Sequence, residues 1–279
     1  MIDWRHWHNE PYLVGGLVLL GWLWALAAGP LRSRFAPGAA FPRREGWYFY
    51  SSLVLFYLSV GSPLDQIGER FLFSAHMLQH QLLMYPVPVL LLCGLTPWMV
   101  DVPLDRPGLR GILRRVLSPL GCGAIVTLVI GVWHAPQLYE WALQDKVIHV
   151  VEHLCFFAAS VLFWWPLLSP SRAYPPVGYG SRMLYLFCLE VSMTPLFAYV
   201  TFTPDVLYPT YEYAPRLIPG FGPADDQLLA GTMMKIVSMI VSVAAIALCF
   251  YFWSKTESAR SKAGAISRSL PGDDADRRG

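Results

Sequence analysis

Residues 147–168 read VIHVVEHLCFFAASVLFWWPLL, an apolar run whose one charged residue is a glutamate. A helix needs about 20 mostly apolar residues to cross the hydrocarbon core of a bilayer. This run has that length. Lipid offers its backbone no hydrogen-bonding partners, which favours a helix over a strand. The run therefore predicts a transmembrane helix, and the polar residues within it need a separate explanation.

Six other segments resemble this run in length and composition. The seven expected spans lie at residues 11–29, 47–61, 71–93, 118–135, 147–168, 183–203 and 226–253. Over the whole chain 55% of residues are hydrophobic and only 14% are charged, whereas soluble domains carry about a quarter charged residues. We therefore predict an all-α polytopic membrane protein, a bundle of seven transmembrane helices surrounded by the lipid bilayer.

Lysine and arginine are unevenly distributed among the segments that connect these spans. If the N-terminus lies outside, 16 of the 21 basic residues fall on the inner side and four on the outer side. Cytoplasmic loops are the ones enriched in Lys and Arg. The bias predicts a periplasmic segment at 1–10, a transmembrane domain at 11–253 and a cytoplasmic C-terminus. Residues 254–279 are polar and charged, which predicts a disordered tail.

All the histidines lie toward the outer side in this topology. They are His6, His8, His76, His80, His134, His149 and His153. Two pairs have a spacing of four residues, which places both rings on one face of a helix, as in helical metal sites. His134 closes the fourth span at the same surface. A lone buried histidine more often bonds a neighbouring helix, but the set of five predicts a shared metal site.

Methionines near these positions bear on which metal would bind. Met77 adjoins the first histidine pair. Met233 and Met234 follow Asp226 by seven and eight residues, which places them on the same face of the last predicted helix. Thioether with imidazole suits copper, whereas carboxylate with imidazole suits zinc. Packing is the ordinary role of a membrane methionine. Copper is therefore the preferred prediction and zinc is the alternative.

Carboxylates near the histidines are candidates to orient the rings. Asp145 and Glu152 flank His149, and Asp226 opens the last span. A carboxylate that accepts the second ring N–H fixes the orientation of a ligating histidine. Glu152 is equally a candidate ligand or acid–base group.

Glu190 and Lys235 are charges expected near the middle of the membrane. At a rise of about 1.5 Å per residue they lie at similar depths in their helices. Charges within spans usually pair with one another. We predict a structural bridge between the sixth and seventh spans, with a proton path as the alternative.

Four motifs follow one another along the chain. They are His76-x-x-Gln79-His80, Trp133-His134-Ala135-Pro136-Gln137-Leu138-Tyr139-Glu140, His149-x-x-Glu152-His153 and Asp226-Gln227-Leu228-Leu229-Ala230-Gly231. Together they resemble the CtaG-type cytochrome c oxidase assembly factors of bacteria, over roughly residues 11–253. The resemblance implies a seven-helix protein of the bacterial plasma (inner) membrane that helps to mature a haem–copper oxidase, in which handling copper is the expected part. It supplies no established ligands.

Three functions are compatible with these residues. The first is a copper-binding assembly factor that takes the ion from a periplasmic copper carrier and presents it to an oxidase subunit, which needs ligand exchange and no catalytic turnover. The second is an intramembrane zinc hydrolase in which Glu152 is the general base. The third is a cytochrome b-like protein with axial histidines on haem, although both histidine pairs lie on one side of the membrane. Nothing in the sequence indicates nucleic-acid binding.

Overall fold

The computed structural model describes residues 4–5 and 7–269, with side chains as far as Ser261. Every regular element in this part of the chain is a helix, as predicted. In chain order they are α1 (Pro11–Ala28), α2 (Arg32–Phe35), α3 (Arg43–Gly61), α4 (Pro63–Arg70), α5 (Phe73–Met84), α6 (Pro86–Cys93), α7 (Pro97–Leu104), α8 (Arg110–Val116), α9 (Pro119–Trp133), α10 (Pro136–Gln144), α11 (Lys146–Leu168), α12 (Tyr179–Phe202), α13 (Pro209–Glu212) and α14 (Pro223–Ser269).

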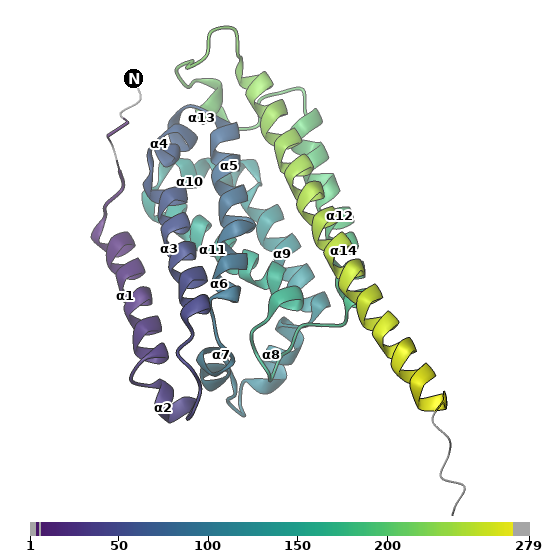
Figure 1. The fold of residues 1–279 in the computed structure, drawn as a ribbon. Coiled ribbons are helices and arrows are strands. Elements are labelled where there is room, and N and C mark those ends of the chain that lie inside the picture. The colour runs from purple at the N-terminus through teal and green to yellow at the C-terminus, as the bar shows by residue number, and fades with distance from the viewer. Residues whose placement is uncertain (1–3, 6, 270–279) are drawn as a thin grey trace, which may run out of the picture.

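The long helices run between two ends of the molecule (Figure 1). The short helices α4, α10 and α13 gather at one end, which we name the site end, and α2, α7 and α8 lie at the opposite end. The described N-terminal residues lie beside the site end, and α14 finishes at the opposite end.

Four helices are long and apolar enough to cross a membrane, namely α1, α11, α12 and α14. Two bent pairs raise the number to six if each is counted as one span. Each of the seven predicted segments overlaps one or two helices, but α3, which holds the second, is not among these candidates. Its first turn carries Arg43, Arg44 and Glu45, and tyrosines and serines follow, so its hydropathy is low.

A proline begins the helix that follows each break in the bent pairs, namely Pro86 in α6, Pro97 in α7 and Pro119 in α9. Pro86 separates α5 from α6, because proline has no N–H to continue the helical hydrogen bonds. α7 turns by 98° from the axis of α5 and α6, and α8 meets α9 at 68°. Ser118 caps α9 at that second bend, where its hydroxyl accepts a hydrogen bond from Gly121 N at 3.1 Å. α7 and α8 therefore turn aside at the opposite end.

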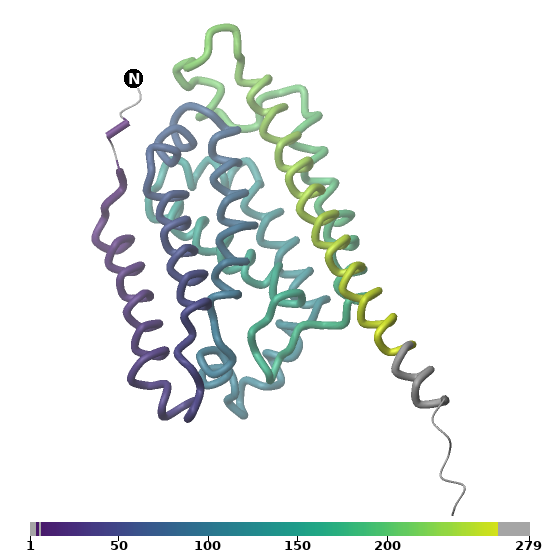
Figure 2. The backbone as a smooth tube through the Cα atoms, viewed as in Figure 1, coloured from purple at the N-terminus to yellow at the C-terminus, as the bar shows by residue number. Residues whose placement is uncertain are grey.

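α11 lies inside the bundle and packs against α5, α6, α9 and α10. α12 and α14 form a hairpin, side by side along much of their length, and α14 also packs on α5 (Figure 1). α1 stands at the edge of the bundle beside α3 (Figure 2). Its buried residues are Gly21, Trp24 and Ala28, all in the half nearer the opposite end.

The structure differs from the sequence prediction after residue 253. α14 continues to Ser269, through a segment expected to be disordered, while residues 270–279 lie outside the described part of the chain. Extending an existing helix costs far less than starting one, since the nucleus is already formed. The first residues past the predicted span also include a Glu257–Arg260 pair at 3.6 Å, three positions apart.

Candidate metal centre

Five imidazoles from three helices meet inside the site end. α5 supplies His76 and His80, α11 supplies His149 and His153, and His134 is the residue at which α9 ends. The ring centroids lie 5.5 Å apart for His76 and His149, 5.4 Å for His80 and His153, and 6.5 Å for His80 and His134. All five side chains are buried. The structure thus brings together the histidines that sequence spacing placed in one pocket.

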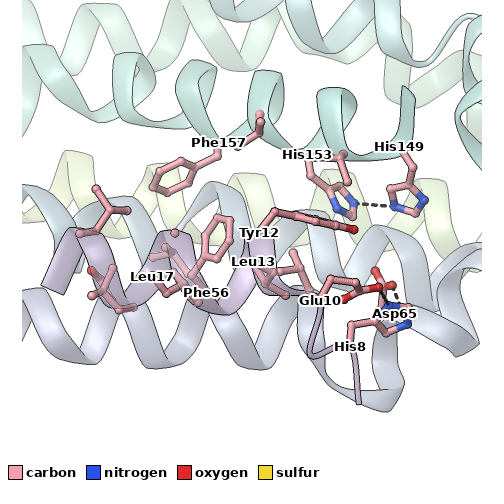
Figure 3. Close-up of a pocket in the computed structure, with 18 of the residues that line it drawn as sticks. His8, Glu10, Tyr12, Leu13, Leu17, Phe56, Asp65, His149, His153 and Phe157 are labelled. Carbon is pink, nitrogen blue, oxygen red and sulfur yellow. Dashed lines mark hydrogen bonds and ion pairs between the residues drawn. The ribbon is translucent and has the colours of Figure 1, made fainter. Parts of the chain in front are cut away.

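Within each pair the Nε2 atoms face each other. They are 2.9 Å apart in His76 and His80, and 3.1 Å apart in His149 and His153 (the latter contact is dashed in Figure 3). Two nitrogens bound to one ion at about 2.0–2.1 Å lie roughly 2.9–3.4 Å apart for bond angles between about 90° and 110°. Each pair therefore has the geometry of a chelating pair.

Fixed acceptors hold the other ring nitrogen of two of these histidines. The Nδ1–H of His149 donates to Glu69 Oε1 at 2.8 Å, and the Nδ1–H of His134 donates to the carbonyl of Ile130 at 2.8 Å. A proton held at Nδ1 leaves a lone pair at Nε2, the form in which histidine binds metals.

His76 has the same tautomer for a different reason. Its Nδ1 lies 3.1 Å from the hydroxyl of Tyr211, which donates its own proton to the carbonyl of Gly68 at 2.8 Å. The Tyr211 oxygen therefore accepts from His76 Nδ1–H. Gly68 also permits this approach, because a Cβ there would lie 2.9 Å from His76 Cα.

Several donor atoms of the centre have no hydrogen-bond partner among the described residues. They are both carboxylate oxygens of Glu152, Nε2 of His134 and Nδ1 of His80. Glu152 is fully buried, and an unpaired buried carboxylate is costly. One donor atom from each of His76, His149, Glu152 and His153 lies within 4.8 Å of the others. This donor set fits a metal ion, whose charge would compensate the carboxylate.

Two carboxylates of α4 that the sequence analysis did not single out stand behind the histidines. Glu69 holds His149, and Asp65 accepts a hydrogen bond from Gln79 Nε2 at 2.6 Å. Although burial opposes ionisation, the hydrogen bond from His149 and the positive charges nearby, including Lys146, lower the pKa of Glu69 to about 2. The sequence did contain an indication of these two carboxylates, since both lie in the short segment directly before the first histidine pair.

Asp145 and Asp226 orient helices, whereas the sequence suggested that they orient rings. Asp145 caps α11 by accepting from Val147 N at 2.8 Å and from Ile148 N at 3.1 Å. The acceptor for the ring N–H of His149 is Glu69. Asp226 caps α5 from another helix, accepting from the backbone N–H groups of the first two helical residues at 2.6 and 3.1 Å. Each aspartate therefore fixes the start of a helix that carries a histidine pair.

The remaining candidates lie away from the rings or in the core. Met77 and Met234 are buried in the hydrophobic core, and Met233 packs against it. Glu190 and Lys235 lie 2.9 Å apart and join α12 to α14, where the predicted bridge was expected. Hydroxyls of Ser238 and Ser242 donate to the other Glu190 oxygen, and Lys235 also donates to Thr194. His6 lies outside the described residues.

The fold and the site together define an all-helical protein with four to six candidate membrane spans and a buried histidine–carboxylate centre. A family model described as cytochrome c oxidase caa3 assembly factor (Caa3_CtaG) matches residues 22–256, which include the whole centre. The chain belongs to this family, as its four motifs predicted. No curated protein and no solved structure was found to match it.

Proposed function

We propose that this protein binds a metal ion, copper in preference to zinc, at the histidine–carboxylate centre and presents it to a haem–copper oxidase subunit during assembly. A periplasmic copper carrier is the proposed donor of the ion. The family match is the basis for the oxidase partner, and the donor atoms of the centre are the basis for the metal ion. The observation that carries the proposal is the pair of facing Nε2 contacts beside the unpartnered carboxylate of Glu152.

We place the site end on the outer face of the bacterial plasma membrane. The proposed seven spans are α1, α3, α5 with α6, α9, α11, α12 and α14. This odd number agrees with the described residues beginning and ending at opposite ends of the molecule (Figure 1). The arginines of α2, of the first turn of α3 and of α8 belong to the opposite end. Basic residues favour the cytoplasmic side, so this arrangement puts the centre nearer the periplasm.

The chemistry needed is ligand exchange. A tetrahedral ion takes four ligands, whereas the centre offers five imidazoles and one carboxylate. The surplus lets one ligand leave while the ion stays bound, so a partner's ligand has room to enter. Held tautomers at His76, His134 and His149 keep Nε2 lone pairs available without rearrangement of the protein.

Metal content of the purified protein tests the proposal. We expect bound copper in the unmodified protein, and its loss in a variant with His76→Ala, His80→Ala, His149→Ala and His153→Ala, because both chelating pairs are removed. Mass spectrometry of metals, together with oxidase activity of the cells, gives the readout. Val151→Ala is the matched control, since Val151 lies on α11 between the two histidines and is exposed. Full metal content in the fourfold variant would refute the site.

The zinc hydrolase remains a second candidate because Glu152 stands beside three imidazoles with both oxygens unpartnered. Zinc in the purified protein, with a hydrolytic activity lost in Glu152→Gln, would favour it. The haem alternative fits the geometry less well. The rings contact one another at centroid distances of 4.3–6.5 Å, and a porphyrin would have to separate them. A Soret band would restore that alternative.

A further inference from the structure

A cavity of about 660 Å³ lies between α1, α3 and α11 (Figure 3). Its walls are mostly apolar, with leucines of α1 facing aromatic side chains such as Phe56 and Phe157. One end is polar, and there His149 and His153 line the cavity from α11. The cavity therefore reaches the metal centre directly from the side of the bundle where α1 stands.

The polar end of the cavity already holds a cation. The ammonium of Lys146 lies 3.5 Å from Glu69 Oε1, 3.9 Å from Asp65 Oδ2 and 3.9 Å from Glu10 Oε1. His8 joins the same group through Nε2, 3.3 Å from Asp65 Oδ2. Three carboxylates thus gather around the Lys146 ammonium and the His8 imidazole, and positively charged partners are the ones that carboxylates bind most strongly.

An additional oxygen donor stands beside Asp65. Gln79 is fully buried, and its amide nitrogen donates to Asp65 Oδ1 at 2.6 Å. Its amide oxygen has no hydrogen-bond partner among the described residues. The internal ion pairs and hydrogen bonds of the group leave this oxygen unused, whereas a bound cation would give it a partner.

His149 connects this outer group to the centre. Its Nδ1 side meets Glu69 at 2.8 Å, its Nε2 meets His153 at 3.1 Å, and its donor atoms lie within 4.8 Å of those of Asp65 and Glu69. Side-chain exposure falls inward along the series, from 47% at Lys146 through 14% at Glu69 to 4% at His149. His149 thus belongs both to the outer carboxylate group and to the buried centre.

We propose that a metal ion reaches the centre through this cavity, and that Asp65 and Glu69 form a transient outer site from which His149 and His153 take the ion. Lys146 gives up its place to the incoming ion and keeps the carboxylates neutralised until then. The proposal rests on the proposed function, because it supplies the route to the same centre. A purely structural ion-pair network would instead affect stability and leave the rate of loading unchanged.

The rate of metal loading separates these possibilities. The full-length protein in detergent is mixed with Cu(I) buffered by a chromophoric chelator, and loading is followed by loss of the chelator complex. In the variant Asp65→Asn we expect loading about tenfold slower, since electrostatic focusing raises association rates by that order. Asparagine keeps an oxygen that can accept the hydrogen bond from Gln79, and Glu69, which holds His149, stays intact, so the final copper content should stay unchanged.

Two further variants sharpen the test. Lys146→Met is expected to load faster, because the competing cation is gone, and unchanged or slower loading would contradict its exchange role. Asp205→Asn is the matched control, an exposed carboxylate of the segment between α12 and α13. A normal loading rate in Asp65→Asn would overturn the route alone, whereas absence of copper from the unmodified protein would overturn the proposed function and the route with it.

Discussion

At the scale of single residues, the centre combines donors found by local spacing with partners found only through the fold. The pairs His76/His80 and His149/His153 follow from a spacing of four in a helix. Glu69, which holds His149, stands 80 positions away from it on another helix. No sequence periodicity connects positions so far apart. From the sequence, Asp145 was therefore a candidate acceptor for the ring N–H of His149, and Glu69 was not recognised. The use of Asp145 as a helix cap became visible only in the structure.

Copper affinity should fall as the pH is lowered, because imidazole must be unprotonated to bind a metal ion. Glu69, with its pKa lowered to about 2, stays ionised throughout the range from pH 7.5 to 5.5. Protonation of Glu69 therefore does not contribute to a loss of affinity in this range. Competition titrations against a chelator of known pH dependence, continued to lower pH, provide the measurement, and an affinity that never falls would argue against histidine ligation.

At the scale of elements, apolar length predicted where the long helices lie. What it missed is the interaction that fixes one helix on another. Asp226 of α14 accepts the first N–H groups of α5, 153 positions earlier. The first N–H groups of a helix have no partner within it, so this contact ties the register of the first histidine pair to the last span.

Asp226→Ala should destabilise the protein by about 0.5–2 kcal/mol, the usual cost of losing a helix cap. Because the cap lies at the start of α5, we also expect weaker metal binding through a less well-placed His76. Thermal unfolding in detergent and copper competition measure the two effects. Asp205→Ala, an exposed aspartate of the same end, should change neither. An unfolding temperature unaffected by Asp226→Ala would show that α5 is fixed by packing alone.

At the scale of the whole molecule, the position of the centre decides which compartment can supply the metal. The histidines, the acidic helix α4 and the polar end of the cavity all belong to the site end. The sequence predicted this gathering from the distribution of histidines, although it could not show that α1 leaves a cavity beside the centre. That feature depends on how one helix packs at an edge, which apolar composition does not encode.

Orientation in the membrane is therefore the decisive property at this scale, and labelling of cysteines in intact cells measures it. In a background where the exposed Cys93 and Cys188 are replaced by serine, an Asp205→Cys variant should react with a membrane-impermeant maleimide. A Gly108→Cys variant, in the exposed segment between α7 and α8, should react only after the membrane is opened. The arginines of α8 favour a cytoplasmic position for that segment, and this is the orientation proposed above. If Gly108→Cys reacts in intact cells and Asp205→Cys does not, the centre faces the cytoplasm. A periplasmic carrier could not then reach it, and copper would have to come from the opposite compartment.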